Sequence, residues 1–173
     1  DARILLFVGR FVKAKGVDLI LKALHLIKDK NLQLVLVGEG AEREHYQSLI
    51  DQFGLGDQVF IFPPTSNVES FYQLADAFVM SSCYEPLGQT LLEAFASGLP
   101  VVAFRRSDVV DTATEELGMD EFITYVNDYL AESLSYAISE VDSGLYAHSL
   151  KIHEAAVKLF SWGALLNRLI ANK

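Results

Sequence analysis

Six short apolar runs recur along the chain, and longer segments with apolar residues at helical spacing lie between them. The runs cover residues 3–8, 32–37, 58–62, 77–80, 100–104 and 121–126. Strands that are apolar without alternation are typical of a parallel sheet covered on both faces. The pattern therefore predicts an α/β fold, with a doubly wound, mostly parallel six-stranded sheet and helices on both faces.

Beyond residue 126 the strand signal ends, and helical spacing continues over residues 129–141, 145–160 and 161–171. We find no internal repeat and no Pro- or Ser-rich linker. The length of 173 residues also suits one domain. We therefore expect a single domain over residues 1–173 with a helical C-terminus.

Charge and cysteine content narrow the possible partners. Lys and Arg number 14 and Asp and Glu 23, which gives a net charge of −9, opposite to that of a typical nucleic-acid binder. Cys83 is the single cysteine, so an internal disulfide and a cysteine-cluster zinc site are excluded, and a reducing compartment such as the cytoplasm is expected. The four histidines form no metal-ligand motif. We expect neither a metal nor a nucleic-acid partner.

The turns after the strands deserve close reading, because open parallel sheets bind ligands at the carboxyl ends of their strands. The turn over residues 9–16 contains Arg10, Lys13 and Lys15 just before a helix. A helix N-terminus favours anions, so this turn suits a phosphate or diphosphate. A solvated basic loop is the alternative interpretation.

The second turn, Gly38-Glu39-Gly40, also follows a strand and precedes a helix. A dinucleotide fingerprint needs a third glycine where this chain has Arg43, which argues against a nicotinamide or flavin site. Gly40 serves either a tight turn or the close approach of a ligand.

The fourth turn carries Glu85 ahead of a helix whose apolar face leaves Gln89, Glu93 and Ser97 on a polar stripe. Glu93 lies five residues beyond Gly88, or about 7.5 Å along the helix, comparable with the span from phosphate to ribose in a nucleotide. Two solvated helix carboxylates are the alternative. Cys83, beside this turn, is interpreted as a packed small side chain rather than a nucleophile.

Together these turns resemble the carboxyl-terminal half of a retaining glycosyltransferase of the GT-B fold, specifically glycosyltransferase family 4. The resemblance rests on Gly9-Arg10 with Lys15-Gly16, on Gly38-Glu39-Gly40, and on the E-x7-E element from Glu85 to Glu93. Gly98-Leu99-Pro100 and the late Phe160-Ser161-Trp162 segment extend it over nearly the whole chain.

The resemblance implies a role for each matching residue. Arg10 and Lys15 would hold the donor diphosphate, Glu93 the ribose hydroxyls, and Glu85 the transferred sugar. The catalytic residues it implies are Glu85, Arg10 and Lys15, and the donor-binding residues are Gly9, Arg10, Lys15, Gly38, Gly40, Glu85, Gly88, Gln89, Thr90 and Glu93.

The function implied is donor binding in a metal-independent retaining hexosyltransferase. The donor would be a UDP-, GDP- or ADP-sugar, and the acceptor a glycan, a lipid or a small molecule. An N-terminal acceptor domain, absent here, would complete the enzyme and make any membrane contact, so this domain alone would transfer little. The alternatives are a non-catalytic α/β nucleotide-binding or interaction module and a GT-B-like nucleotide-sugar epimerase.

Two segments depart from the family pattern. Arg105-Arg106-Ser107-Asp108 stands where relatives often have a glycine pair and a glutamate, and we assign this loop no role. Pro63-Pro64 replaces a glycine near the nucleotide base, so the sequence leaves the base open.

Overall fold

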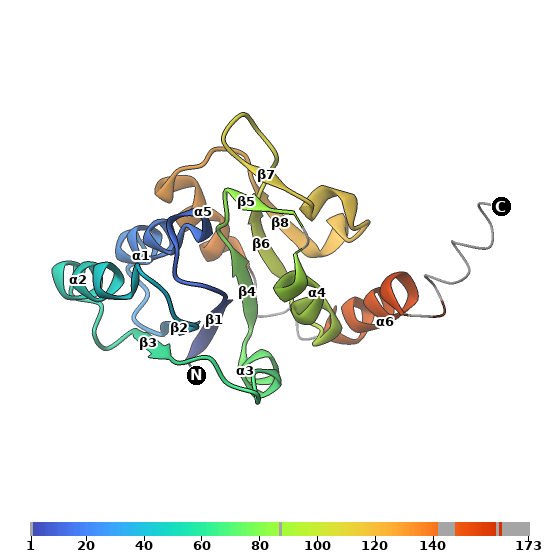
Figure 1. The fold of residues 1–173 in the computed structure, drawn as a ribbon, viewed down its shortest axis with the longest axis horizontal. Coiled ribbons are helices and arrows are strands. Elements are labelled where there is room, and N and C mark those ends of the chain that lie inside the picture. The colour runs from blue at the N-terminus through green and yellow to red at the C-terminus, as the bar shows by residue number, and fades with distance from the viewer. Residues whose placement is uncertain (1, 87, 142–147, 162, 164–173) are drawn as a thin grey trace.

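The six predicted strands pair side by side in one parallel sheet (Figure 1), in the order β3-β2-β1-β4-β6-β8. They are β1 Arg3–Val8, β2 Leu32–Val37, β3 Val59–Phe62, β4 Ala77–Met80, β6 Val101–Phe104 and β8 Ile123–Val126. The structure is a computed structural model that describes residues 2–86, 88–141, 148–161 and 163. It confirms the expected α/β fold.

Helices cover both faces of the sheet. The elements of the first face are α1 (Val17–Leu26), α2 (Arg43–Phe53) and α5 (Ala131–Glu140). The second face carries α3 (Glu69–Leu74), α4 (Gln89–Ala96) and α6 (Ser149–Phe160). Each face thereby has its own hydrophobic core, as the doubly wound pattern predicts.

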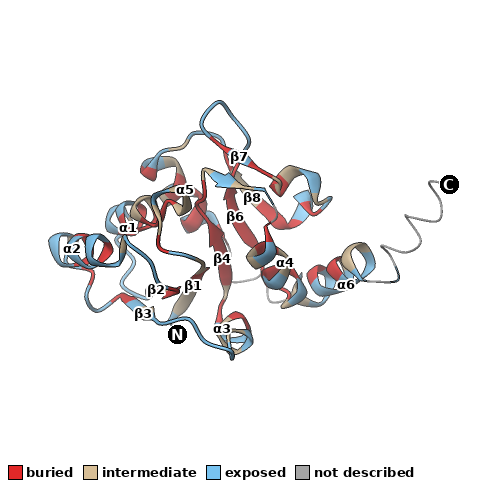
Figure 2. Cartoon of the chain, in the orientation of Figure 1, coloured by how far each residue is buried: buried red, intermediate tan, exposed pale blue. Residues whose placement is uncertain are grey.

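Strand residues are apolar throughout because successive side chains enter different cores. In β1, Leu5 and Phe7 belong to the core under α1, whereas Leu6 belongs to the core under α4. Side chains alternate across a strand, so a strand covered on both faces must be apolar at every position. Figure 2 shows the central strands buried along most of their length.

Some boundaries differ from the sequence-based expectation. The strand expected over residues 121–126 begins at Ile123, because Asp120–Phe122 forms a 3-10 helix, η3. The strands expected from residues 58 and 100 each begin one residue later. The helix expected over residues 145–160 is described from Ser149. The helix expected over 161–171 lies outside the described residues, apart from 161 and 163.

Two short elements were not predicted from the sequence. β5 (Tyr84–Glu85) pairs in parallel with β7 (Asp111–Thr112) in a separate two-stranded sheet. Two further 3-10 helices, η1 (Lys13–Lys15) and η2 (Thr114–Glu116), lie in the turns that follow β1 and β7. The two short strands and the two 3-10 helices lie in the connections that follow strands of the main sheet, and the turns after β1 and β4 carry the candidate residues.

The strand order reverses between β1 and β4. From β1 the chain adds β2 and β3 on one side, and it then returns to place β4 on the other side of β1. Helices on opposite faces leave a crevice at such a reversal, and ligands of doubly wound sheets bind there. The turns after β1 and β4 flank this point.

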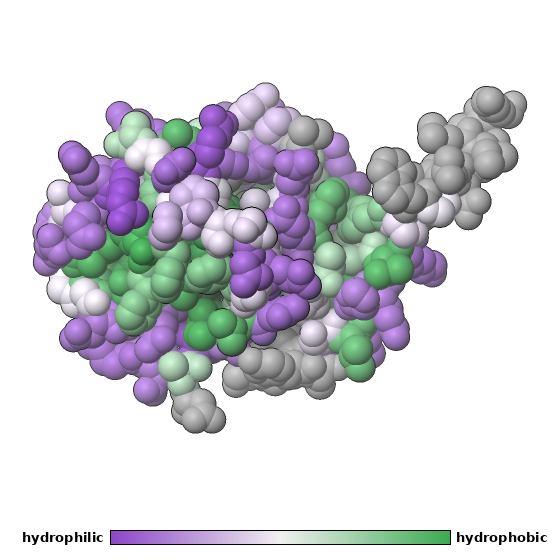
Figure 3. Space-filling model, turned by 60° about the horizontal axis from the view of Figure 1, so that its bottom comes forward, coloured by the Kyte–Doolittle hydropathy of each residue, from purple (hydrophilic) through white to green (hydrophobic). Residues whose placement is uncertain are grey.

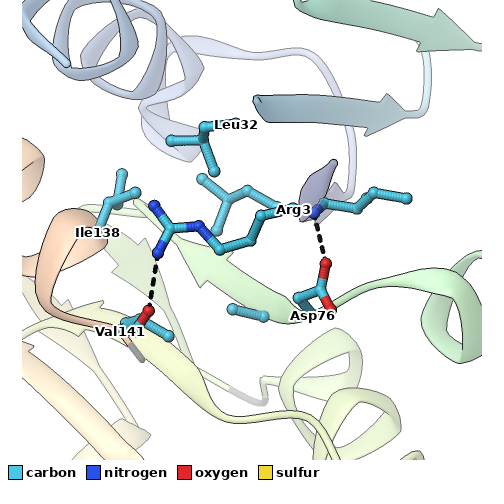
Figure 4. Close-up of a pocket in the computed structure, with 8 residues that line it drawn as sticks. Arg3, Leu32, Asp76, Ile138 and Val141 are labelled. Carbon is cyan, nitrogen blue, oxygen red and sulfur yellow. Dashed lines mark hydrogen bonds between the residues drawn. The ribbon is translucent and has the colours of Figure 1, made fainter. Parts of the chain in front are cut away.

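The opposite, amino edge is closed by structural contacts (Figure 4). Arg3 donates from Nη1 to the carbonyl of Val141 at 3.0 Å, and the backbone N–H of Ile4 donates to Oδ2 of Asp76 at 2.6 Å. The cavity between them measures about 10 Å³, close to the volume of one water probe. This cavity therefore holds about one water molecule.

The six-residue α3 leaves part of its sheet face uncovered. Phe60 and Phe62 on β3 are each 40% exposed and Leu74 on α3 is 68% exposed. Figure 3 shows hydrophobic residues gathered over part of the surface turned toward the viewer. Within the described part of the chain, no helix is long and apolar enough to cross a membrane.

Candidate functional site

The turns after β1 and β4 are tied together by backbone contacts. The N–H of Cys83 donates to the carbonyl of Ala14 at 2.9 Å, and the Ser81 hydroxyl donates to the carbonyl of Lys15 at 2.7 Å. Cys83 is half-buried in this turn. These bonds fix Lys15 beside the fourth turn.

Gly16 permits this close approach. Its backbone is left-handed, with φ 63°, and a Cβ atom there would collide with the Ser81 carbonyl and lie 2.6 Å from the Tyr129 hydroxyl. That hydroxyl itself donates to the Ser81 carbonyl at 3.0 Å. A side chain at residue 16 would separate the two turns.

The second turn packs on the first in the same way. Gly38 has φ 155°, and a Cβ atom there would collide with the Gly9 carbonyl oxygen. A Cβ atom on Gly40 would collide with the Phe11 backbone in the same way. The N–H of Phe11 donates to the carbonyl of Glu39 at 2.7 Å. Gly40 thus allows the backbone of the first turn to approach closely.

Lys15 and Glu85 form an ion pair in this cluster, with side chains only 17% and 14% exposed. Glu85 also accepts from the N–H of Gly88 at 3.3 Å, so its carboxylate lies at the N-terminus of α4. A helix N-terminus favours an anion, and here a carboxylate of the protein itself takes that place. Glu85 thus engages two of the groups that the sequence analysis assigned to an anion, the Lys15 ammonium and the backbone N–H of Gly88.

The pairing of β5 with β7 holds Glu85 in position. Its carbonyl accepts from the N–H of Ala113 at 3.1 Å, and the N–H of Asp111 donates to the carbonyl of Cys83 at 2.8 Å. Thr112, opposite Glu85 in the register, is buried and shares a hydrogen bond of 3.0 Å with Thr114. These hydrogen bonds therefore fix the backbone position from which the Glu85 carboxylate extends.

A groove of about 370 Å³ opens beside this cluster. Its wall is built from the turns that follow β1, β2 and β3 and from α4: Val8, Gly9, Arg10, Val37, Gly38, Glu39, Pro64, Thr65, Val68, Thr90 and Glu93. Arg10 is exposed, and its side chain has no hydrogen-bond or ion-pair partner among the described residues. A cation without a partner in a groove suits an anionic ligand.

Glu93 has a partner that sequence reasoning missed. The hydroxyl of Tyr72, on α3, donates to its Oε2 at 2.9 Å, and the carbonyl of Thr90 lies 3.3 Å from the same hydroxyl. Burial, and then the charge of Glu93, raise the pKa of Tyr72 well above its ordinary value. Tyr72 is therefore a neutral donor throughout the physiological range.

The predicted donor-binding residues fall into two neighbouring groups. Gly9, Arg10, Gly38, Thr90 and Glu93 line the groove. Lys15, Glu85 and Gly88 form the ion-pair cluster. A Cβ on Gly9 would lie 4.0 Å from Cε of Lys15, so the two groups adjoin. Gly40 and Gln89 belong to neither.

The two arginines in the loop after β6 form ion pairs with nearby acids. Arg105 pairs with Glu115 at 2.9 Å and lies 4.2 Å from the centroid of the Tyr125 ring. Arg106 pairs with Glu116 at 2.9 Å and with Asp111 at 3.1 Å. Both guanidinium groups are thus committed to acids of their own loop.

No group of three or more His, Cys, Asp or Glu side chains among the residues described could hold a metal ion. The charged groups described at the carboxyl edge include Arg10, Glu39 and Glu93 in the groove and the pair of Lys15 and Glu85 beside it.

Residues 1–143 match the model of the family described as Glycosyl transferases group 1. That match covers most of the chain. The chain belongs to this glycosyltransferase family. The expected membership of a glycosyltransferase family is confirmed, and the finer assignment to family 4 stays a prediction.

Curated glycosyltransferases are similar over part of their length. A lipopolysaccharide core biosynthesis glycosyltransferase, LpsD of Rhizobium meliloti, is 39% identical over 105 residues, which are 61% of this chain and 30% of LpsD. Glycogen synthase 2 of Nitrosococcus oceani is 33% identical over 167 residues, 90% of this chain and 34% of the synthase. This chain thus spans about a third of each of these two glycosyltransferases.

Solved structures share the fold. Sucrose-phosphate synthase from Thermosynechococcus elongatus matches with a TM-score of 0.81 and 30% identity, over 100% of this chain and 47% of that one. TarM of S. aureus, solved with UDP, has a TM-score of 0.84 at 22% identity, over 98% of this chain and 35% of its own. The glycosyltransferase fold expected from the turns is thereby confirmed.

Proposed function

We propose that this chain is the donor-binding domain of a retaining hexosyltransferase that uses a nucleoside diphosphate sugar. One observation carries the proposal: Arg10, without a partner among the residues described, lines the same groove as Glu93, at the strand reversal of a glycosyltransferase fold. TarM was solved with UDP, and HepE of Anabaena with UDP and glucose, which supports a donor of this class.

The diphosphate would be held by Arg10, by Lys15 and by backbone amides at the start of α4, near Gly88, Gln89 and Thr90. Lys15 and the amide of Gly88 are engaged by Glu85 before the donor arrives. A diphosphate carries more negative charge than one carboxylate, so it would replace Glu85 on these groups. Glu85, once released, would accept hydrogen bonds from hydroxyls of the transferred sugar.

Glu93 would bind the ribose hydroxyls. Its Oε2 accepts from Tyr72, and its Oε1 has no hydrogen-bond partner among the described residues. A carboxylate can accept several hydrogen bonds, so a vicinal diol is a suitable ligand.

In the transfer, the bond from the anomeric carbon to the diphosphate oxygen breaks and a bond to the acceptor oxygen forms. The acceptor hydroxyl proton passes to the departing phosphate oxygen. Attack on the face that the leaving group departs from retains the configuration. Arg10 and Lys15 would stabilise the charge that develops on the diphosphate, in the place a metal would otherwise take.

The acceptor would be bound by an N-terminal domain of the same polypeptide. The chain covers only about a third of LpsD and of glycogen synthase 2, which supports a larger complete enzyme. Its single cysteine suits the cytoplasm as the compartment, and any membrane contact would belong to the other half.

The test is product analysis with the complete enzyme, UDP-, GDP- and ADP-sugars, candidate acceptors and EDTA. We expect nucleotide release with a glycoside, or free sugar, of retained anomeric configuration. Arg10→Ala should lower this activity about 100-fold, whereas Lys28→Ala, an exposed cation at the other edge, should leave it unchanged. An epimerised nucleotide sugar, or no reaction and no binding, would contradict the proposal.

A further inference from the structure

Tyr72 lies under the wall of the groove without lining it. The ring is 1% exposed, and α3, which carries it, packs between β1 and α4. Its hydroxyl reaches Oε2 of Glu93 at 2.9 Å from behind the groove wall. A buried group therefore contacts the carboxylate that the ligand would meet.

This contact restrains a side chain that is otherwise unrestrained. Glu93 is exposed on α4, and among the described residues Tyr72 supplies the hydrogen bond that its carboxylate accepts. An exposed glutamate on a helix samples several rotamers, each of which must be lost when a ligand binds. A fixed hydroxyl at Oε2 selects one of them before binding.

The chemistry of the pair favours a neutral donor and a charged acceptor. The hydroxyl has one proton, and the carboxylate at 2.9 Å is a better acceptor than the Thr90 carbonyl at 3.3 Å, which lies in the first turn of α4. Because the pKa of Tyr72 is raised by burial, this proton is retained at any physiological pH. Oε1 remains for ligand hydroxyls.

We propose that Tyr72 is a positioning residue for ribose recognition: its hydroxyl orients Glu93 so that the groove selects nucleotides with ribose hydroxyls over those without them. The inference rests on the proposed function, since it assigns Glu93 to the ribose. It adds a residue that never touches the ligand but sets the specificity of the one that does.

The test compares Tyr72→Phe with the unmodified complete protein by calorimetry. UDP, GDP and ADP are titrated first, and the tightest of them is then compared with its 2′,3′-dideoxy analogue. A hydrogen bond to a charged group corresponds to a preference of about 10- to 100-fold for the ribonucleotide. We expect Tyr72→Phe to reduce that preference about fivefold or more, while the affinity for the dideoxy analogue changes less than twofold.

Two further variants complete the experiment. Tyr46→Phe is matched for burial, because Tyr46 is also 1% exposed and donates to the Val12 carbonyl rather than to a groove residue. It should leave the preference unchanged. Glu93→Gln should abolish most of the preference, and adding Tyr72→Phe to it should change little further. Thermal unfolding verifies that each variant is folded.

The outcomes separate the two proposals. If none of the three nucleotides binds the unmodified protein, the proposed function fails. If a nucleotide binds with a clear ribose preference that Tyr72→Phe leaves intact, the positioning role alone is overturned. Equal weakening of both ligands by Tyr72→Phe also overturns it, because that result means a structural role. Should Tyr72→Phe not fold, a preference undiminished in Glu93→Gln overturns it.

Discussion

Lys15 and Glu85 neutralise each other at the carboxyl edge of the sheet, and Glu85 also accepts from the N–H of Gly88 at the N-terminus of α4. Glu85 thus occupies the cation and the helix terminus that are proposed to hold a diphosphate. Donor binding would exchange one anion for another at these groups, and it would release Glu85 toward the sugar.

This exchange predicts opposite effects of one substitution. Glu85→Gln removes the competing charge, so the complete protein should bind a free nucleoside diphosphate several-fold more tightly. The same variant should lose about 100-fold in transfer, because the sugar loses its charged acceptor. Calorimetry with UDP, GDP and ADP, together with a transfer assay, measures both.

Glu140→Gln is the matched control for Glu85→Gln. Glu140 is exposed at the end of α5, and its replacement removes the same charge without touching the groove. Weaker nucleotide binding in Glu85→Gln would show that Glu85 does not compete for Lys15.

Arg10→Ala should weaken binding of the nucleoside diphosphate about 10- to 100-fold. The guanidinium has no partner among the residues described, so the free energy of unfolding should change by less than about 0.5 kcal/mol. The loss should shrink when NaCl is raised from about 0.05 to 0.5 M, because salt screens exposed charges. Equal loss at both concentrations, or none at either, would argue against a direct phosphate contact.

Gly16 and Gly54 share a left-handed backbone, so alanine substitutions at these two positions distinguish the cost of steric crowding from the cost of the backbone conformation. Gly16 has φ 63° and Gly54 has φ 65°, but only Gly16 is enclosed, since nothing lies within 4 Å of a Cβ at Gly54. Gly54→Ala should cost about 1 to 2 kcal/mol of unfolding free energy. Gly16→Ala should cost about 3 kcal/mol or more, because it also pushes Ser81 and Tyr129 away. Denaturant unfolding measures the difference, and equal costs would refute the crowding.

Two buried tyrosines and one half-buried tyrosine predict a loss of stability at high pH. Burial is the largest cause that raises the pKa of Tyr46, Tyr72 and Tyr129, so above pH 10 the unfolded chain releases protons that the folded chain keeps. The stability that these tyrosines contribute is present below pH 10, and above it each tyrosine that stays protonated in the folded state removes at most about 1.4 kcal/mol per pH unit. Tyr72→Phe should make this decline shallower in unfolding experiments between about pH 9 and 11.5. An unchanged slope would mean that Tyr72 ionises in the folded state.

The strands at the centre of the sheet could be predicted from the local pattern of apolar residues. The runs at residues 3–8, 32–37 and 77–80 are strands with the expected bounds, because each must be apolar on both faces. The strand expected from residue 121 failed at its start, where Asp120–Phe122 closes into a 3-10 turn. The turns and the family resemblance that they carry indicated Gly9, Arg10 and Gly38, and the polar stripe of a helix indicated Glu93; these residues line one groove.

The remainder depended on contacts between residues far apart in sequence. The pairing of Glu85 with Thr112 joins two strands of two residues each, too short to leave a periodic signal. Tyr72 lies on a helix of six residues, and its bond to Glu93 spans 21 positions. The ion pair of Lys15 with Glu85 spans 70. Spacing places such residues at one edge of the sheet but does not say which of them meet.

A structure of the protein with UDP, GDP or ADP, whichever binds most tightly, tests the central claim most directly. The account predicts the diphosphate on Arg10 and Lys15, the carboxylate of Glu85 released from Lys15, and a ribose hydroxyl on Glu93, with the Tyr72 contact retained. A nucleotide bound outside this groove, or a diphosphate held by Arg105 and Arg106 with the Lys15 and Glu85 pair intact, would contradict it.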